Sequence, residues 1–257
     1  MPIEIVNYPI LNDIHFPYED KARYRVALKI MKSLPNIGHI YLNGDITEFL
    51  AVSAHPKYPG ESVSFCREVE YANAKFDELQ KMFPDIPVTY LCGNHEHRFF
   101  RYIRDLAPQM WGLTDCPKLF NFPDRPKWKF VDYGPKQIVR CGKSNLYLRH
   151  EPRAGGANHA LTTAMKSNVD TAYGHTHQYQ EATHKTFGVV EKTVRAYSLG
   201  WLGDESYNVF DYRGPKDNWV KGMSVVDAEP KSGDYTLDFI NMTRLPVIYK
   251  GERFDAK

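Results

Sequence analysis

The sequence predicts an α/β fold in which two β-sheets face each other and helices cover their outer sides. Three observations lead to this prediction. The first hundred residues alternate between strand and helix patterns, the second half is mostly strands, and polar residues with metal-binding side chains follow the apolar strands. With 257 residues and 42% hydrophobic content, the chain can bury a sizeable core.

The first half follows a strand–helix repeat. Apolar and β-branched runs predict the strands, and apolar side chains at helical spacing predict the helices, two of which stop at Pro35 and Pro84. The predicted strands are 3–11, 37–42 and 87–90, and the predicted helices are 20–34, 63–83 and 98–106. Such alternation implies βαβ crossovers and a largely parallel sheet.

The second half is richer in strands. We predict a hairpin over 129–139, strands at 145–149 and 169–173, a helix at 157–167, and alternating strands and turns over 179–249, with turns at 212–215 and 231–234. Residues 50–62 and 108–128 have loop-like composition. Since no linker divides the chain, we expect one domain spanning residues 1–257.

Composition narrows the functional classes. The net charge of +2 gives no overall bias toward polyanions, and the four cysteines form no Cys-x-x-Cys pair. The N-terminus lacks the pattern of a signal peptide, and no apolar run reaches the roughly 18 residues of a membrane span. We therefore expect a soluble, cytoplasmic protein that does not bind membranes.

Polar clusters follow five predicted strands. An Asp-x-His or His-x-His pair places two side chains on the same side of an extended segment. Mixed carboxylate and imidazole ligands suit zinc, manganese or iron. Seven ligands are too many for one ion but suit two ions about 3.5–4 Å apart. The clusters contain Asp13, His15, Asp45, Asn94, His95, His150, His175 and His177.

In this order, the motifs resemble the signature of calcineurin-like metallophosphoesterases. The resemblance implies a four-layer αββα sandwich, a dinuclear metal centre and hydrolysis of phosphomonoesters or phosphodiesters by a metal-bound hydroxide. The expected cofactors are two divalent ions from among Mn, Fe, Zn and Ni, with Mn favoured. By position, the first ion would be held by Asp13, His15 and His177, the second by Asn94, His150 and His175, and both by a bridging Asp45.

The resemblance also assigns catalytic roles. His95 matches the motif histidine that stands beside the leaving-group oxygen, and we expect it to act as general acid. Family members often carry an Asp where this chain has Glu48, so we expect the longer Glu48 to hold His95 and favour its protonated form. A second departure is Glu151-Pro152 after His150, where the family commonly has Gly, and we expect a different loop there.

The substrate class is less constrained. Arg98, Arg101 and Arg104 alternate with aromatic residues just after the motif, which favours a phosphodiesterase or nuclease acting on nucleic acid or nucleotides, with Arg98 and Asn94 contacting substrate. The same pattern also fits an amphipathic helix with a solvated basic side. The alternatives are a phosphomonoesterase acting on phosphoproteins or small molecules and, from another class, a metal-free binding scaffold on the same fold.

Overall fold

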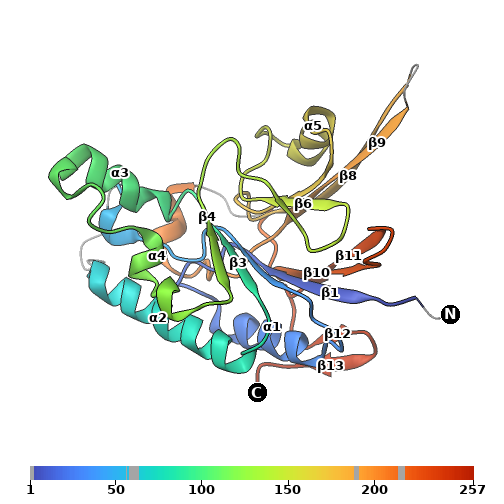
Figure 1. Cartoon of the computed structure of the whole chain (residues 1–257), viewed down its shortest axis with the longest axis horizontal. Helices are drawn as coiled ribbons and strands as arrows, with labels where there is room; N and C mark the ends of the chain where they lie inside the picture. Colours follow the sequence, from blue (N-terminus) through green and yellow to red (C-terminus); the bar gives the residue numbers. More distant parts are fainter. Residues whose placement is uncertain (1–2, 56, 58–63, 188–190, 214–217) are drawn as a thin grey trace.

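Two β-sheets dominate the computed structural model, which describes residues 3–55, 57, 64–187, 191–213 and 218–257 (Figure 1). The six-stranded sheet has the order β11-β10-β1-β2-β3-β4, and the five-stranded sheet has the order β5-β6-β7-β9-β8. A separate two-stranded ribbon pairs β12 with β13.

The six-stranded sheet has a parallel half and an antiparallel half. Strands β1 to β4 run parallel, while β10 and β11 join antiparallel beside β1. Parallel pairing needs crossovers, and the helices supply them. The strands are β1 (Val6–Leu11), β2 (Ile40–Asn43), β3 (Val88–Leu91), β4 (Trp128–Val131), β10 (Gly222–Ala228) and β11 (Tyr235–Asn241).

The five-stranded sheet is also mixed. Its centre, β6, β7 and β9, is parallel, and β5 and β8 are antiparallel edges. Its strands are β5 (Val139–Arg140), β6 (Leu146–Arg149), β7 (Asp170–Tyr173), β8 (Tyr179–Thr186) and β9 (Lys192–Leu199), and the ribbon consists of β12 (Val247–Tyr249) and β13 (Glu252–Phe254).

Helices cover the outer sides of both sheets, with α1 and α2 below the first sheet and α5 above the second in Figure 1. The long helices are α1 (Lys21–Ser33), α2 (Phe65–Met82), α3 (His97–Leu106) and α5 (His159–Lys166), and α4 (Cys116–Leu119) is a single turn. Short 3₁₀ turns are η1 (Leu50–Val52), η2 (Pro108–Met110), η3 (Phe122–Asp124) and η4 (Asn208–Arg213).

Strand alternation divides the core into layers. On β2, Ile40 and Leu42 pack with α1 and α2, while Tyr41 between them faces the second sheet. On the far side, Ala164 of α5 packs against β7 and β9. The layers are therefore helix, sheet, sheet, helix, as the sequence predicts.

One predicted element is wrong. Residues 129–139 do not form a hairpin, because β4 pairs in parallel with β3 while β5 pairs with β6 of the other sheet. The segment instead carries the chain from one sheet to the other, and Gly134, with φ +155°, lies within this crossing. The pattern showed two short β runs around a turn but held no information on which partners they choose.

Other expectations agree with the structure within two or three residues. The turn at 231–234 joins β10 to β11, and the 108–128 excursion contains η2, α4 and η3. Part of the predicted 50–62 loop, the first residue of the predicted 63–83 helix and part of the predicted 212–215 turn lie outside the described residues. Within the described ranges, no helix has both the length and the apolar character needed to cross a membrane.

Candidate metal centre

The predicted ligands lie in the loops that follow parallel strands of the two sheets. Five of them adopt left-handed backbone conformations, which L-residues rarely take: Asp13, His15, Asp45, His175 and His177, with φ of 48°, 57°, 49°, 67° and 59°. Among the described residues, only three other non-glycine positions have positive φ. Each such residue costs about 1–3 kcal/mol and persists only where its surroundings enforce it.

Hydrogen bonds between loops enforce these conformations. The backbone N–H groups of Asp13 and His15 donate to the carbonyls of Gly44 and Asp45, so the loops after β1 and β2 continue side by side beyond the sheet. The N–H of His175, from the loop after β7, donates to both carboxylate oxygens of Asp13 at 3.0 Å. The two sheets are therefore joined at the ligands themselves.

Close approach at two glycines brings the ligands together. A Cβ on Gly44, which has φ +83°, would lie 2.2 Å from Nδ1 of His150, and a Cβ on Gly174 would lie 2.2 Å from Oδ2 of Asp13. Only glycine leaves room for the neighbouring ligand at either position.

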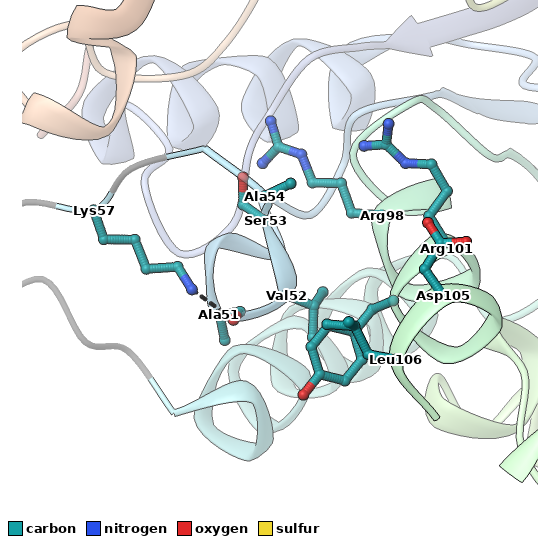
Figure 2. A pocket seen from close by; sticks show the side chains of 10 residues that line it. Ala51, Val52, Ser53, Ala54, Lys57, Arg98, Arg101, Asp105 and Leu106 are labelled. Atoms are coloured by element: carbon teal, nitrogen blue, oxygen red, sulfur yellow. Dashed lines mark hydrogen bonds between the residues drawn. The ribbon is translucent and has the colours of Figure 1, made fainter. Parts of the chain in front are cut away.

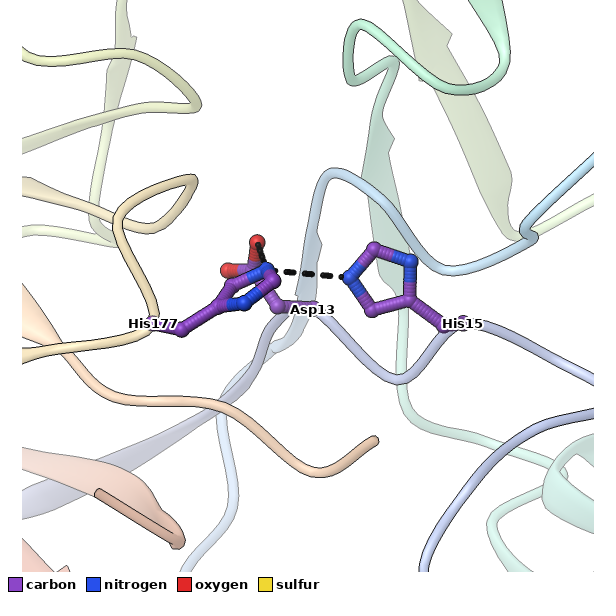
Figure 3. A group of neighbouring side chains, drawn as sticks. All are labelled: Asp13, His15 and His177. Atoms are coloured by element: carbon purple, nitrogen blue, oxygen red, sulfur yellow. Dashed lines mark hydrogen bonds and ion pairs between the residues drawn. The ribbon is translucent and has the colours of Figure 1, made fainter. Parts of the chain in front are cut away.

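Asp13, His15 and His177 form the first ligand group (Figure 3). Nε2 of His15 lies 3.1 Å from Nε2 of His177, which lies 3.3 Å from Oδ1 of Asp13. Atoms that ligate one ion at about 2.0–2.2 Å are themselves about 3 Å apart. The first predicted ligand set therefore has the spacing of a coordination sphere.

The second group consists of Asp45, His150 and His175, with Asn94 beside them. Nε2 of His150 lies 3.2 Å from Oδ2 of Asp45 and 3.1 Å from Oδ1 of Asn94, and Nδ1 of His175 lies 2.7 Å from the same Asn94 oxygen. Asn94 and His175 are half-buried, while the other ligands are buried. The centre therefore opens toward Asn94 and His175.

The imidazole tautomers test whether a cation fits. Nδ1 of His15 donates to Glu48 Oε2 at 2.8 Å, and Nδ1 of His150 donates to the Asn43 carbonyl at 3.0 Å. In the neutral form of each ring, Nε2 therefore carries the lone pair and faces further acceptors, an arrangement typical of metal-binding histidines. Since carboxylate, amide and imidazole acceptors face one another in a buried space, only a proton or a cation can compensate them, and the donor set fits divalent metals.

The charges of Asp13, Asp45 and His150 shift one another's pKa values. Burial alone raises the pKa of Asp45, but the charge of His150 and its hydrogen bond outweigh burial and lower it well below its usual range. Burial lowers the pKa of His150, but the carboxylates of Asp45 and Asp13 raise it to about 10. Burial raises the pKa of Asp13 to about 6. Without metal, the His150 proton stabilises the two carboxylates.

Glu48 lies behind both the ligands and His95. Its Oε2 is 2.8 Å from Nδ1 of His15 and 2.8 Å from Nδ1 of His95, and its Oε1 accepts from Arg98 at 2.5 Å. These groups lower the pKa of Glu48 well below its usual range, although burial raises it. A fully buried, ionised Glu48 therefore orients a predicted ligand and the predicted acid together.

The protonation of His95 differs from the expectation. Burial and the charge of Arg98 lower its pKa to about 4, although Asp45 and Glu48 oppose this shift. Arg98 donates to Nε2 of His95 at 3.0 Å, so His95 is neutral in the free protein. Because Arg98 is only 3% exposed and bonds to Glu48 and His95, its position favours a positioning role over the predicted substrate contact.

Glu96 is a structural residue of the site that sequence reasoning left without a role. Its fully buried carboxylate accepts the backbone N–H groups of Asp45, Thr47 and Gly93 and the hydroxyl of Tyr90. It therefore ties the loop after β2 to the loop after β3. Its position directly after His95 in the sequence could have suggested a role in the site. The sequence did not show which backbone N–H groups its carboxylate would accept.

Trp201 supports the first ligand group from behind. Its fully buried ring stacks on His177 with the ring centroids 4.7 Å apart, and the Lys221 ammonium lies 3.8 Å from the centre of a Trp201 ring. Stacking fixes the plane of the His177 ring and with it the direction of its nitrogen lone pair.

The sequence profile of calcineurin-like phosphoesterases matches residues 10–179, which include every predicted ligand. The chain belongs to this family. Its activity class is therefore phosphoester hydrolysis with divalent metal ions.

Two further proteins resemble the chain. The Gene 54 protein of Mycobacterium phage D29 is 21% identical over 233 residues, covering 86% of this chain and 88% of the phage protein. The NAD nucleotidase NadN of Haemophilus influenzae aligns with 99% of this chain at 10% identity and a TM-score of 0.39, and the chain spans about half of that protein (54%). A likeness this weak has no bearing on what this chain hydrolyses.

We predict that metal binding releases a proton from His150. Its raised pKa keeps the imidazole protonated until the pH rises through about 10, whereas a metal ion takes the neutral form. Affinity should therefore rise about tenfold per pH unit between pH 7 and 9. Titration calorimetry at pH 7.5 in buffers of different ionisation enthalpy should show about one proton released per chain. No release in the wild type, or equal release in His150→Asn, would contradict this assignment.

Proposed function

We propose that the chain is a phosphodiesterase that uses two metal ions, with Mn favoured, and acts on nucleic acid or nucleotides. The single observation that carries the diester preference is a pair of cavities, one lined by a predicted ligand and the other by the side chain that contacts His95. One, of about 440 Å³, is lined by Arg98, whose guanidinium contacts His95. The other, of about 380 Å³, is lined by His175 and Thr176 together with the 151–156 loop and His159.

Two cavities match the chemistry of a diester. A phosphodiester carries an organic group on each side of phosphorus, whereas a monoester carries one and would leave one cavity empty. Both volumes fall within the range of about 300–1,000 Å³ typical of ligand pockets. The Glu151-Pro152 departure from the family pattern lines the second cavity, and Glu151 there accepts a hydrogen bond from Tyr133.

We assign the ligands of the two ions according to the two groups of neighbouring side chains described above. Asp13, His15 and His177 would hold one ion, Asn94, His150 and His175 the other, and Asp45 both. When bound, such ions lower the pKa of water and offset negative charge on the phosphoryl oxygens. The completeness of this donor set argues against a metal-free binding scaffold.

We assign proton transfer to the leaving oxygen to Nε2 of His95. Glu48 holds Nδ1, so Nε2 is the ring atom left to face substrate once the Arg98 hydrogen bond rearranges. The negative charge of a bound phosphodiester favours the protonated imidazole, because a nearby anion raises the pKa of histidine. Arg98 then stays beside the reacting group through its bonds to Glu48.

A substrate panel tests the proposed function. With Mn²⁺, kcat/KM for bis-p-nitrophenyl phosphate and for oligonucleotides should exceed that for p-nitrophenyl phosphate and phosphopeptides by at least about tenfold, a difference near 1.4 kcal/mol. A chelator should abolish activity and added metal should restore it. A preference for the monoesters would overturn the diester assignment, and activity that survives complete metal removal would overturn the metal dependence.

Leaving-group dependence tests the role of His95. General acid catalysis contributes about 10²–10⁴-fold, so His95→Ala should lose a factor in this range on a nucleoside leaving group and much less on p-nitrophenolate. The half-buried His184 on β8 provides a control, and His184→Ala should keep the wild-type rate. An equal loss for every leaving group, or loss of bound metal in His95→Ala, would show that His95 positions or ligates instead.

A further inference from the structure

We propose that the cavity between η1 and α3 is a nucleotide subsite for single-stranded nucleic acid, holding the nucleotide on the leaving-group side of the scissile bond. This inference rests on the proposed function and specifies the substrate of the same site. The cavity is lined by Ala51, Val52, Ser53, Ala54, Lys57, Arg98, Arg101, Tyr102, Asp105 and Leu106.

The cavity lies next to the group that contacts the proposed proton donor. Arg98 forms part of its wall and donates to both Glu48 and Nε2 of His95. An occupant of the cavity is therefore one side chain away from the proposed proton donor. Because His95 serves the leaving oxygen, the occupant belongs to the fragment that leaves.

The charge of the cavity suits a phosphate. Figure 2 shows the side chains of Arg98 and Arg101 extending from α3 in the same direction, toward the η1 side. Arg101 is exposed, and none of the ion pairs found among the described residues involves it. The one lining carboxylate, Asp105, is paired with Arg104 at 2.6 Å. The positive charge of Arg101 therefore remains available to the next phosphate along a strand.

The apolar walls suit a base. Tyr102 is 42% exposed, and Leu106 and Val52 complete an apolar surface beside it. Aromatic rings next to a cationic groove are the usual means by which single strands are bound, since every base has a face that stacks. The cavity thus combines a ring for a base with a cation for the adjoining phosphate.

More exposed apolar side chains come after Leu106 in the sequence. Met110, Trp111 and Leu113 are exposed, and Trp111 lines a separate cavity with Phe100 and Ile103. Beside Arg101 itself, the apolar wall consists of Tyr102, Val52 and Leu106. A phosphopeptide needs the cation but not an aromatic ring next to it, so the observations favour a nucleic-acid strand over a phosphoprotein.

Direct binding tests the subsite without turnover. The probe is a fluorescently labelled single-stranded DNA of about 12 nucleotides, titrated with the full chain in the presence of a chelator and read by anisotropy. Arg101→Ala should weaken binding about 5- to 20-fold and reduce the slope of log K against log[salt] by about 0.7. Tyr102→Ala should weaken binding similarly without changing the slope.

Arg25 provides the matched control. It is exposed on α1, it is in none of the ion pairs found among the described residues, and it does not line the cavity. Arg25→Ala should therefore change affinity less than about twofold, which is under 0.5 kcal/mol. Equal weakening by Arg101→Ala and Arg25→Ala would show an effect of general surface charge and overturn the subsite.

Kinetics separates this inference from the function on which it rests. Arg101→Ala should lose at least about threefold more kcat/KM on the oligonucleotide than on bis-p-nitrophenyl phosphate, which has no neighbouring phosphate.

If wild-type protein hydrolyses the small diester but neither binds nor cleaves the oligonucleotide, the subsite fails and the diesterase assignment stands. If oligonucleotide binding depends on Arg101 but no diester is hydrolysed, the diesterase assignment fails, and the leaving-group placement fails with it. Stronger competition by a phosphopeptide than by unlabelled oligonucleotide would overturn the nucleic-acid assignment.

Discussion

The site depends on one electrostatic constraint, the convergence of many acceptor atoms in a space that is largely buried. Two carboxylates, one amide oxygen and four imidazoles meet there, and the hydrogen bonds behind His15 and His150 direct their Nε2 atoms toward that space. Such an arrangement is unfavourable unless protons or cations occupy it. In the free protein the His150 proton fills part of this role, which is why its pKa is raised to about 10.

The backbone is organised to maintain that convergence. Five ligand positions are left-handed, and they are enforced because the loops after β1, β2, β3 and β7 bond to one another rather than to solvent. Glu96 contributes to this, since a single buried carboxylate accepts from two loops at once. Strain of this kind is characteristic of functional sites, where the surrounding structure stabilises a backbone conformation that the local chain would not adopt by itself. Support from Glu48 and Trp201 extends the same rigidity to the rings of His15, His95 and His177.

Much of the fold and the identity of the converging residues could be predicted from the sequence, because both follow from local pattern. Strands run into Asp13, Asp45, Asn94 and His175, and parallel strands bring their carboxyl ends to one edge. The 129–139 hairpin was predicted wrongly, since partner choice between sheets is a long-range property. Glu48 contacts His95 and raises its pKa, as the sequence suggests, but burial and the charge of Arg98 outweigh this effect, and neither could be foreseen from the motif. The burial of the Arg98 side chain was not predicted either, because helical spacing alone did not reveal that Glu48 would be its partner.

We propose that Asp45 would hold both metal ions of a single centre. Electron paramagnetic resonance of the protein loaded with two equivalents of Mn²⁺ tests it most directly, because ions about 3.5–4 Å apart that share a carboxylate are exchange-coupled. The account predicts a coupled signal in the wild type that is lost in Asp45→Asn, with the conservative amide keeping the shape of the loop. The six-line signal of isolated Mn²⁺ in fully loaded wild-type protein, or a coupled signal that persists unchanged in Asp45→Asn, would contradict it.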